Sequence, residues 1–316
     1  MTRITRILVP TDFSATSDEA LAYARTLAGQ FGASLHLLHA FDDPFTSTAF
    51  ASEMFSTLPL SLREEQITDA RRRLDDRLPA DQKARFSGTA EIVSGQPAKV
   101  IVDYAAAIQA DLIVMGTHGR SGVAHLLLGS VAERVVRGAP APVLTIRTAP
   151  AGSLTHILVP TDFSETADAA LEYAFQIAER FGASVQLLHV LDDPFVTDGF
   201  TAEAYIAEAP TLRTAMLKDA QAKLKHRAWA RDGRVTVASE VLFGHGAKTI
   251  AEYAAERDVD LIVLGTHGRT GVAHLLLGSV AERLVRIAPC PVLTVRHAAA
   301  RKEYPELIYD VEHLPA

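Results

Sequence analysis

Cysteine is almost absent from the 316-residue sequence, in which Cys290 is the only one. A single cysteine cannot form an intrachain disulfide or a Cys-x-x-Cys site, so Cys290 is expected to be a small buried apolar residue. No apolar run approaches the roughly 18 residues of a membrane span. The opening residues, MTRITRILVPTDF, do not resemble a signal peptide. The sequence therefore predicts a cytoplasmic protein without a membrane span.

Positive charge is also scarce, because 31 lysines and arginines face 38 aspartates and glutamates, for a net charge of -7. This balance argues against a general nucleic-acid binder, which normally presents a basic surface. The basic run 71–73 is followed by two aspartates, so we expect a solvated helix face there and no nucleic-acid patch. An acidic protein can still bind an anion locally, through backbone amides and an arginine.

Internal repetition is the most prominent feature that is present. The octapeptide ILVPTDFS occurs at 7–14 and again at 157–164. Residues 6–45 match residues 156–195 at 26 of 40 positions, and residues 111–137 match residues 260–286 at 24 of 27. A period of about 150 residues is that of a whole domain. We predict one domain over 1–150, a second over 151–297, and a C-terminal tail over 298–316 that packs on the body or on a partner.

Each copy alternates short apolar runs with helical patterns. The expected strands are 6–10, 34–40, 89–95, 110–116 and 142–147, and, in the second copy, 156–160, 184–190, 235–241, 259–265 and 291–296. Helices are expected from Ser14 to about Gln30, over 60–78, from Pro97 onward and over 130–138. Alternating helices and almost continuously apolar strands are typical of buried parallel sheets. We therefore predict an α/β fold of two tandem five-stranded parallel-sheet domains, Rossmann-like, with helices on both faces.

A long glycine loop follows the fourth strand of each copy, with the sequence GTHGRSGVAHLLLGS at 116–130 and GTHGRTGVAHLLLGS at 265–279. Its spacing, G-x2-G-x9-G-S, is neither a P-loop nor a G-x-G-x-x-G fingerprint. Glycine permits unusual backbone conformations and a close approach to a ligand. The patterns Ser130-Val-Ala-Glu133 and Ser279-Val-Ala-Glu282 predict capping boxes, at helix starts suited to phosphate.

A second loop, Pro10-Thr11-Asp12, follows the first strand. In doubly wound sheets, ligands bind at the carboxyl ends of the strands, where the strand order reverses. The carboxylate of Asp12 could accept hydrogen bonds from ribose hydroxyls or an adenine amino group there. The alternative is that Asp12 only caps the first helix.

These motifs resemble the universal stress protein family in its tandem form. The matching residues are I-L-V-P-T-D-F-S, L-L-H-A or L-L-H-V, and the glycine loop followed by V-A-E-R. The resemblance covers nearly the whole chain and implies a strand order of 3-2-1-4-5. It implies an adenine nucleotide, ATP, ADP or AMP, with or without Mg²⁺, in members that carry the loop. It also implies pairing through the fifth strands, here as an internal pseudo-dimer, and leaves a further homodimer open.

The binding residues implied by the resemblance fall at matching positions of the two copies. For adenine and ribose they are Asp12, Asp162, Ala40 and Val190, with Thr11 and Thr161 as turn or ligand residues. For ribose and phosphates they are Gly116, Gly119, Gly129, Ser130 and Val131, and Gly265, Gly268, Gly278, Ser279 and Val280. Arg120 and Arg269 face either phosphate or solvent.

The favoured function is a nucleotide-dependent regulator or sensor of the stress response that acts on an unknown protein partner. A P-loop lysine is missing and no catalytic base is identified, so at most slow ATP hydrolysis is expected. Histidines recur at matching positions, such as His118 and His125 of the loop, but form no set of metal ligands. Two alternatives stay open: a nucleotide-using enzyme, through adenylate chemistry or ATP hydrolysis, and a ligand-free interaction scaffold.

Overall fold

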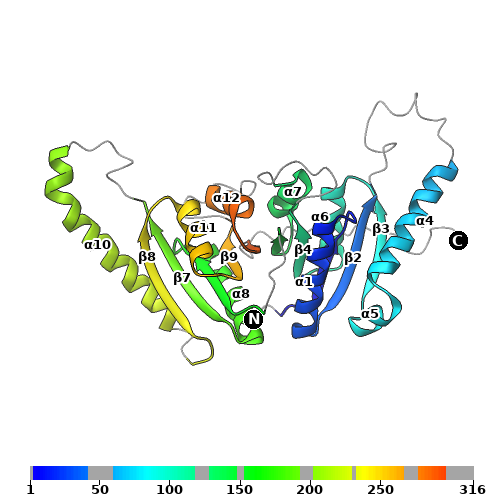
Figure 1. Cartoon of the computed structure of the whole chain (residues 1–316), viewed down its shortest axis with the longest axis horizontal. Coiled ribbons are helices and arrows are strands. Elements are labelled where there is room, and N and C mark those ends of the chain that lie inside the picture. Colours follow the sequence, from blue (N-terminus) through cyan, green and yellow to red (C-terminus); the bar gives the residue numbers. More distant parts are fainter. Residues whose placement is uncertain are drawn as a thin grey trace.

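In the computed structural model, the two sequence repeats form two similar halves that share one ten-stranded sheet (Figure 1). The structure describes residues 3–41, 60–117, 128–147, 153–192, 202–229, 233–266 and 277–296. The strand order is β3-β2-β1-β4-β5-β10-β9-β6-β7-β8. Each half therefore has the predicted order 3-2-1-4-5, and the predicted α/β fold class is confirmed.

The first half alternates strands and helices as its apolar pattern predicts. Its elements are β1 (Arg6–Pro10), α1 (Ala15–Phe31), β2 (Ser34–Phe41), α4 (Leu60–Arg77), α5 (Ala80–Arg85), β3 (Thr89–Ser94), α6 (Pro97–Ala107), β4 (Leu112–Gly116), α7 (Ser130–Gly138) and β5 (Val143–Ile146). The short helix α5 was not predicted. The other boundaries differ from the expected ones by only a few residues, because strand and helix ends depend on local hydrogen bonds.

The second half repeats this arrangement. Its elements are β6 (His156–Pro160), α8 (Glu165–Phe181), β7 (Ser184–Leu191), α10 (Ala202–Trp229), β8 (Val237–Phe243), α11 (Gly246–Glu256), β9 (Leu261–Gly265), α12 (Ser279–Ile287) and β10 (Val292–Val295). Strand β8 begins two residues later than expected, and helix α10 extends over 28 residues. In the described part of the chain, no helix combines the length and the apolar character that a membrane crossing requires.

The two halves are joined through their fifth strands. All strand pairs within a half are parallel, whereas β5 and β10 pair antiparallel. Two buried threonines reinforce the seam: the hydroxyl of Thr145 donates to the Val292 carbonyl, and that of Thr294 donates to the Val143 carbonyl, both at 3.1 Å. The predicted internal pairing is confirmed, and it covers the strand edge that each half would otherwise expose.

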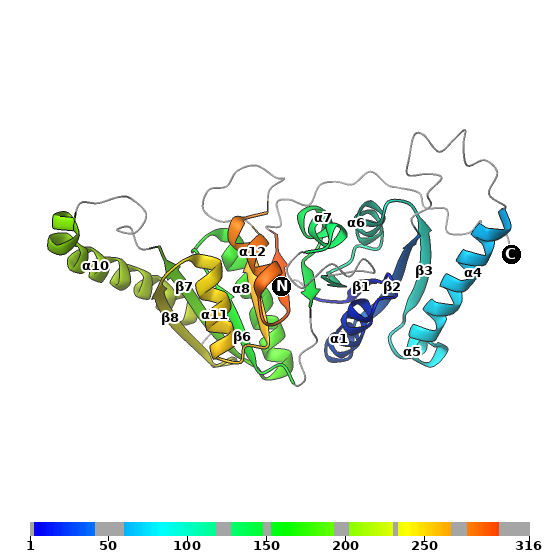
Figure 2. The ribbon, with the colours of Figure 1, turned by 45° about the horizontal axis from the view of Figure 1, so that its top comes forward.

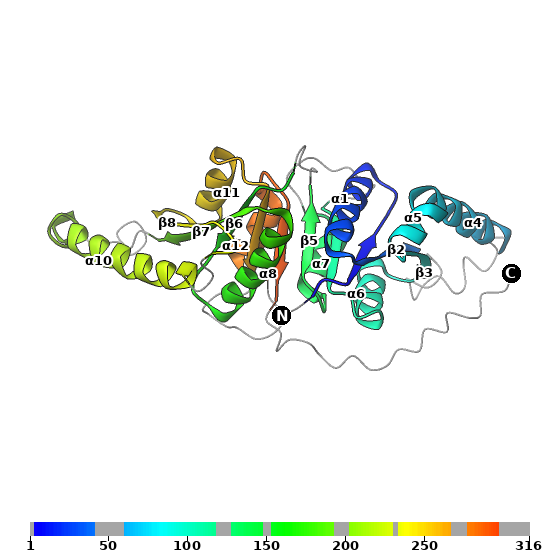
Figure 3. The ribbon, with the colours of Figure 1, turned by 90° about the horizontal axis from the view of Figure 1, so that it is seen from below.

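Helices cover both faces of the shared sheet, and each face has its own core. Figures 1 and 3 show α1 and α8 side by side near the centre, with α4 and α10 at opposite ends. These four helices pack on one face, and α6, α7, α11 and α12 pack on the other (Figure 2). Ile7 and Val9 point into the first core and Leu8 into the second, each fully buried. Burial on both faces explains the continuously apolar strands.

The first helix of each half begins and ends as the sequence predicts. The hydroxyl of Ser14 caps α1 by accepting from the Ser17 amide, and Ser164 caps α8 in the same way. Gly32 and Gly182 end these helices with φ values of 64° and 68°, which favour glycine. Because the caps fix where each helix starts, they also fix the loop between the first strand and the first helix.

Candidate functional site

Each half has a cavity at the carboxyl ends of its first and fourth strands, where the strand order reverses. The volumes are about 330 Å³ in the first half and about 230 Å³ in the second. The first cavity is lined by Pro10, Thr11, Asp12, Ser17, Ala40, Pro97, Ile101, Met115, Gly116, Thr117, Gly129, Ser130, Val131 and Ala132. The loop Pro10-Thr11-Asp12 and the described ends of the glycine loop therefore meet at one site, at the place where such sheets bind ligands.

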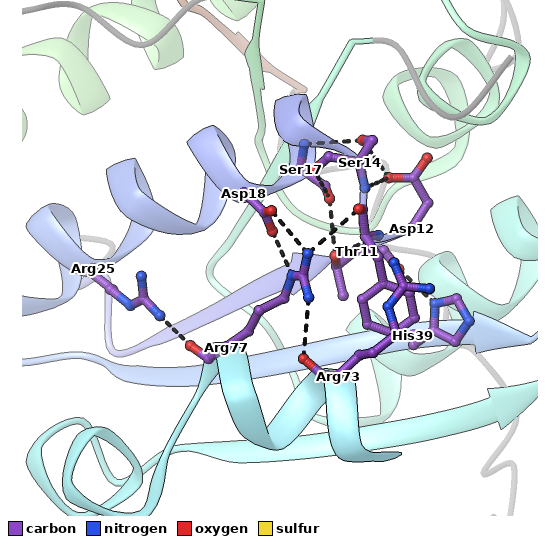
Figure 4. A network of polar contacts seen from close by, with 10 residues as sticks. Thr11, Asp12, Ser14, Ser17, Asp18, Arg25, His39, Arg73 and Arg77 are labelled. Atoms are coloured by element: carbon purple, nitrogen blue, oxygen red, sulfur yellow. Dashed lines mark hydrogen bonds and ion pairs between the residues drawn. The ribbon is translucent and has the colours of Figure 1, made fainter. Parts of the chain in front are cut away.

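Asp12 lines the first cavity and is oriented by its own turn. Its Oδ1 accepts hydrogen bonds from the Ser14 hydroxyl at 2.6 Å and the Ser14 amide at 3.1 Å (Figure 4). Asp162 makes the same two bonds to Ser164, at 2.6 and 3.0 Å. The helix caps are Ser14 and Ser164, so the alternative that Asp12 only caps the first helix is wrong. The serine instead holds the carboxylate at the cavity.

Thr11 has both a turn role and a place in the cavity wall. Its buried hydroxyl accepts from the Phe13 amide at 3.0 Å and shares a hydrogen bond with Ser17. Thr161 accepts from the Phe163 amide at the same distance and lines the second cavity. These contacts establish the turn role of both threonines, and contact with a ligand remains a prediction.

The residue after each aspartate adopts a conformation that is rare outside glycine. Phe13 has a φ of 65° and Phe163 a φ of 67°, in the left-handed region. The ring of Phe13 lies 4.3 Å from that of His39, whose Nδ1 donates to the Thr11 carbonyl at 2.8 Å. In the second half, the ring of His189 lies 4.3 Å from that of Phe163, and its Nδ1 donates to the Thr161 carbonyl. These contacts give His39 and His189 a structural role in the two turns.

Gly116 and Gly265 line the cavities, but the unusual backbone conformation expected of them is not found. Neither residue has a left-handed φ. An added Cβ at Gly116 would instead lie 3.0 to 3.1 Å from Thr16, and one at Gly265 would lie 2.9 Å from the Thr166 backbone. The first helix of each half crosses the end of the fourth strand so closely that a side chain has no room.

The capping boxes predicted at Ser130 and Ser279 are also wrong. The N-caps are Gly129 and Gly278, and each serine is the first helical residue. The pattern S-x-x-E is compatible with a serine at the N-cap or at the first helical position, so the sequence alone does not distinguish the two positions. Since glycine has no side chain, neither N-cap makes a side-chain hydrogen bond to the first turn, and the residues of that turn line the cavity. Such a helix start is suited to a phosphate oxygen.

Thr117, which the sequence did not single out, pins the two ends of the glycine loop. Its carbonyl accepts from the Gly129 amide at 2.8 Å, and its amide donates to the Ile146 carbonyl at 2.9 Å. Thr266 makes the equivalent bonds in the second half. The sequence signal for this role is the threonine that follows the first glycine of the loop in both copies. Gly119, Arg120, Gly268 and Arg269, like the loop histidines, lie outside the described residues.

The remaining predicted residues mark a difference between the two cavities. Ala40 and Val131 line the first cavity, and Val190 and Val280 line the second. Val190 is bulkier than Ala40, and the second cavity is the smaller of the two. Ala167 replaces Ser17, which removes a hydroxyl. The two sites are therefore similar in design and unequal in size.

Metal and thiol chemistry find little support in the described parts of the chain. Those parts contain no group of three or more histidine, cysteine, aspartate or glutamate side chains arranged to hold a metal ion. Cys290 is buried, as predicted, and does not line either cavity. Burial, with a smaller contribution from Asp260, raises the pKa of the Cys290 thiol to about 12. The thiol is therefore protonated at neutral pH.

Comparisons with known proteins match both halves of the chain to one family. A family model described as the universal stress protein family matches residues 3–147 and again 154–296. A universal stress protein of Methanocaldococcus jannaschii is 40% identical over 143 residues, which cover 44% of this chain and 81% of that protein. One of Mycobacterium tuberculosis H37Rv is 27% identical over 302 residues, covering 92% and 97%. A solved universal stress protein of Archaeoglobus fulgidus DSM 4304 shares the fold, with a TM-score of 0.65 at 22% identity over 93% of this chain and 99% of that one.

Proposed function

Because the chain belongs to the universal stress protein family, with one family domain in each half, we propose that it is a stress-response regulator that binds an adenine nucleotide in each half. The nucleotide is ATP, ADP or AMP, with or without Mg²⁺. The observation that carries this proposal is the repeated cavity, with a carboxylate at the end of the first strand and an uncapped helix start beside the fourth.

The two ends of each cavity suit the two ends of a nucleotide. The carboxylates of Asp12 and Asp162 accept hydrogen bonds from ribose hydroxyls or the adenine amino group. The helix starts at Ser130 and Ser279 receive phosphate, since free N–H groups and the helix dipole both favour an anion. The apolar wall, including Ile101 in the first half, packs against the base.

A regulator fits these cavities better than an ATP-consuming enzyme. Among the described residues that line the first cavity, Asp12 has the only charged side chain. Asp12 already accepts two hydrogen bonds from Ser14, which suits binding more than proton transfer. Positioning of the phosphates alone supports at most slow hydrolysis. Occupancy instead shifts the chain between conformations that differ in affinity for a protein partner.

Co-purified nucleotide tests the proposal most directly. Protein purified without added nucleotide is denatured, and the released small molecules are identified by mass spectrometry and counted per chain. Nucleotide-free protein is then titrated with ATP by calorimetry, with and without Mg²⁺, and ATP hydrolysis is measured separately. We expect up to two equivalents of adenine nucleotide and slow or no hydrolysis. Absence of bound nucleotide together with no heat of ATP binding would contradict the proposal and favour a ligand-free scaffold.

A further inference from the structure

The turn that carries each aspartate is strained and needs support from outside itself. Phe13 and Phe163 are bulky residues with a left-handed φ, a conformation that persists only when surrounding contacts hold it. Within the turn, the hydroxyl of Thr11 accepts from the Phe13 amide. The carbonyl of Phe13 accepts its hydrogen bond from another element, the helix α4.

Arg77, the last residue of α4, supplies that donor in the first half. Its Nε and Nη2 donate to the two carboxylate oxygens of Asp18 at 2.6 and 2.9 Å, and Nη2 also lies 3.5 Å from the Phe13 carbonyl (Figure 4). One turn earlier, the Arg73 guanidinium lies 4.2 Å from the centre of the Phe13 ring. Arg73 is therefore not simply part of the solvated face expected for the run 71–73.

The second half builds the same arrangement. Arg227 of α10 donates to both carboxylate oxygens of Asp168, at 2.6 and 3.0 Å, and to the Phe163 carbonyl at 3.3 Å. Lys223 takes the place of Arg73, with its Nζ 5.7 Å from the centre of the Phe163 ring. Each of the two arginines forms a bidentate pair with an aspartate of its own half. The side chains of Arg77 and Arg227 are about four-fifths buried, with exposed fractions of 21% and 20%.

This agreement is informative because the two long helices come from segments that otherwise diverge. Between 46–110 and 196–259 the copies share little, yet the pattern D-A-x3-L-x2-R recurs at 69–77 and at 219–227. Its apolar residues, Leu74 and Leu224, are fully buried beneath the helices. The arginine that ends the pattern reaches the same carbonyl in both halves. Neither arginine lines a cavity, so any effect on a ligand passes through the turn.

We propose that Arg77 and Arg227 are positioning residues of the two sites, each holding the turn that presents Asp12 or Asp162 to a ligand. This inference rests on the proposed function for the identity of the ligand. The arginine couples the site to a long helix at the outer end of the sheet. Coupling is reciprocal, so nucleotide in a cavity stabilises the end of α4 or α10, and a partner that displaces the helix weakens nucleotide binding.

Titration of the full-length chain with ATP tests the coupling. Arg77→Gln is compared with Arg72→Gln, a matched control one turn away whose exposed side chain pairs with Asp69 of its own helix. We expect Arg77→Gln to weaken one of two equivalents of ATP about tenfold, the size of one lost charge-assisted contact, and to leave the other unchanged. The control variant should bind as the wild type does.

Two further measurements separate positioning from a general loss of stability. Amide hydrogen exchange of residues 12–14 should accelerate in Arg77→Gln and not in Arg72→Gln. Adding Arg77→Gln to Asp12→Asn should cause no further loss of affinity, because the arginine acts through that carboxylate. If Arg77→Gln binds ATP as the wild type does, or if the losses of affinity from Arg77→Gln and Asp12→Asn add in the double variant, the positioning role is overturned and the proposed function is left intact. If the wild type neither carries a bound adenine nucleotide nor binds ATP, the proposed function is wrong, and unchanged exchange in the turn then overturns the positioning role of Arg77 as well.

Discussion

The crossing of α8 over the end of β9 leads to a prediction about Gly265. An alanine there would place its Cβ 2.9 Å from the carbonyl carbon and Cγ2 of Thr166, and 3.0 Å from its carbonyl oxygen. Ordinary contacts of a Cβ begin near 3.4 Å, so α8 has to move by about 0.5 Å. Backbone atoms of a capped helix cannot relieve such an overlap by rotating, as the end of a flexible side chain can.

The expected cost of Gly265→Ala follows from this overlap. Overpacking of a tightly packed core typically lowers the free energy of unfolding by about 1–3 kcal/mol. At Gly116 the corresponding distances are 3.0 to 3.1 Å, so Gly116→Ala should fall at the lower end of that range. Gly29, inside α1, is the matched control, because an added Cβ there meets nothing within 4 Å. Gly29→Ala should stabilise the chain by up to about 1 kcal/mol through helix propensity.

Urea unfolding followed by far-ultraviolet circular dichroism measures these differences. The expected order of stability is Gly29→Ala, wild type, Gly116→Ala and then Gly265→Ala. All four proteins should be measured without nucleotide, so that a change in ligand affinity does not contribute. If Gly265→Ala is as stable as the wild type, the helix crossing does not require glycine, and the residue serves only the approach of a ligand.

Two further predictions concern the thiol and the unequal cavities. The pKa of Cys290 is raised from 9.0 to about 12, so its contribution to stability is present below pH 9 and is lost as pH rises toward 12. The thiol of the native protein should resist alkylation by iodoacetamide at pH 8, and equal alkylation of native and urea-unfolded protein would contradict this. Between pH 9 and 11, the free energy of unfolding of Cys290→Ala should fall less than that of the wild type. Ala40→Val should weaken ATP binding at the first site about tenfold, as expected for overpacking, and Val190→Ala should strengthen the second, as measured by calorimetry; unchanged affinities would show that neither position limits the cavity.

The strands and the location of the two cavities could be predicted from the sequence, because the strands and the loops that follow them depend on local patterns. Ile7, Leu8 and Val9 are consecutive apolar residues, and burial on both faces of a sheet requires such a run. A loop after the first strand and another after the fourth necessarily reach the same edge of a parallel sheet. The order of the strands, in contrast, came from the resemblance to a family, since the apolar pattern does not specify which strands are neighbours.

What could not be predicted depends on contacts between distant residues. Gly116 is required by Thr16 of α1, a residue 100 positions earlier. The positioning contact joins Arg77 to a carbonyl 64 residues away, and nothing in the local charge pattern of α4 distinguishes Arg77 from its neighbours. The sizes of the two cavities depend also on how several helices pack, and the aligned sequences of the two repeats do not give that packing.

Because β5 and β10 lie on one chain, their antiparallel pairing does not depend on the protein concentration. Two separate copies that pair through such strands come apart on dilution, whereas strands on one chain keep a high effective concentration for each other. The two cavities therefore always occur together in a ratio of one to one. In a symmetric homodimer every substitution appears twice, at both sites. A single chain with two halves can change one site alone, and the difference between Ala40 and Val190 is a change of that kind.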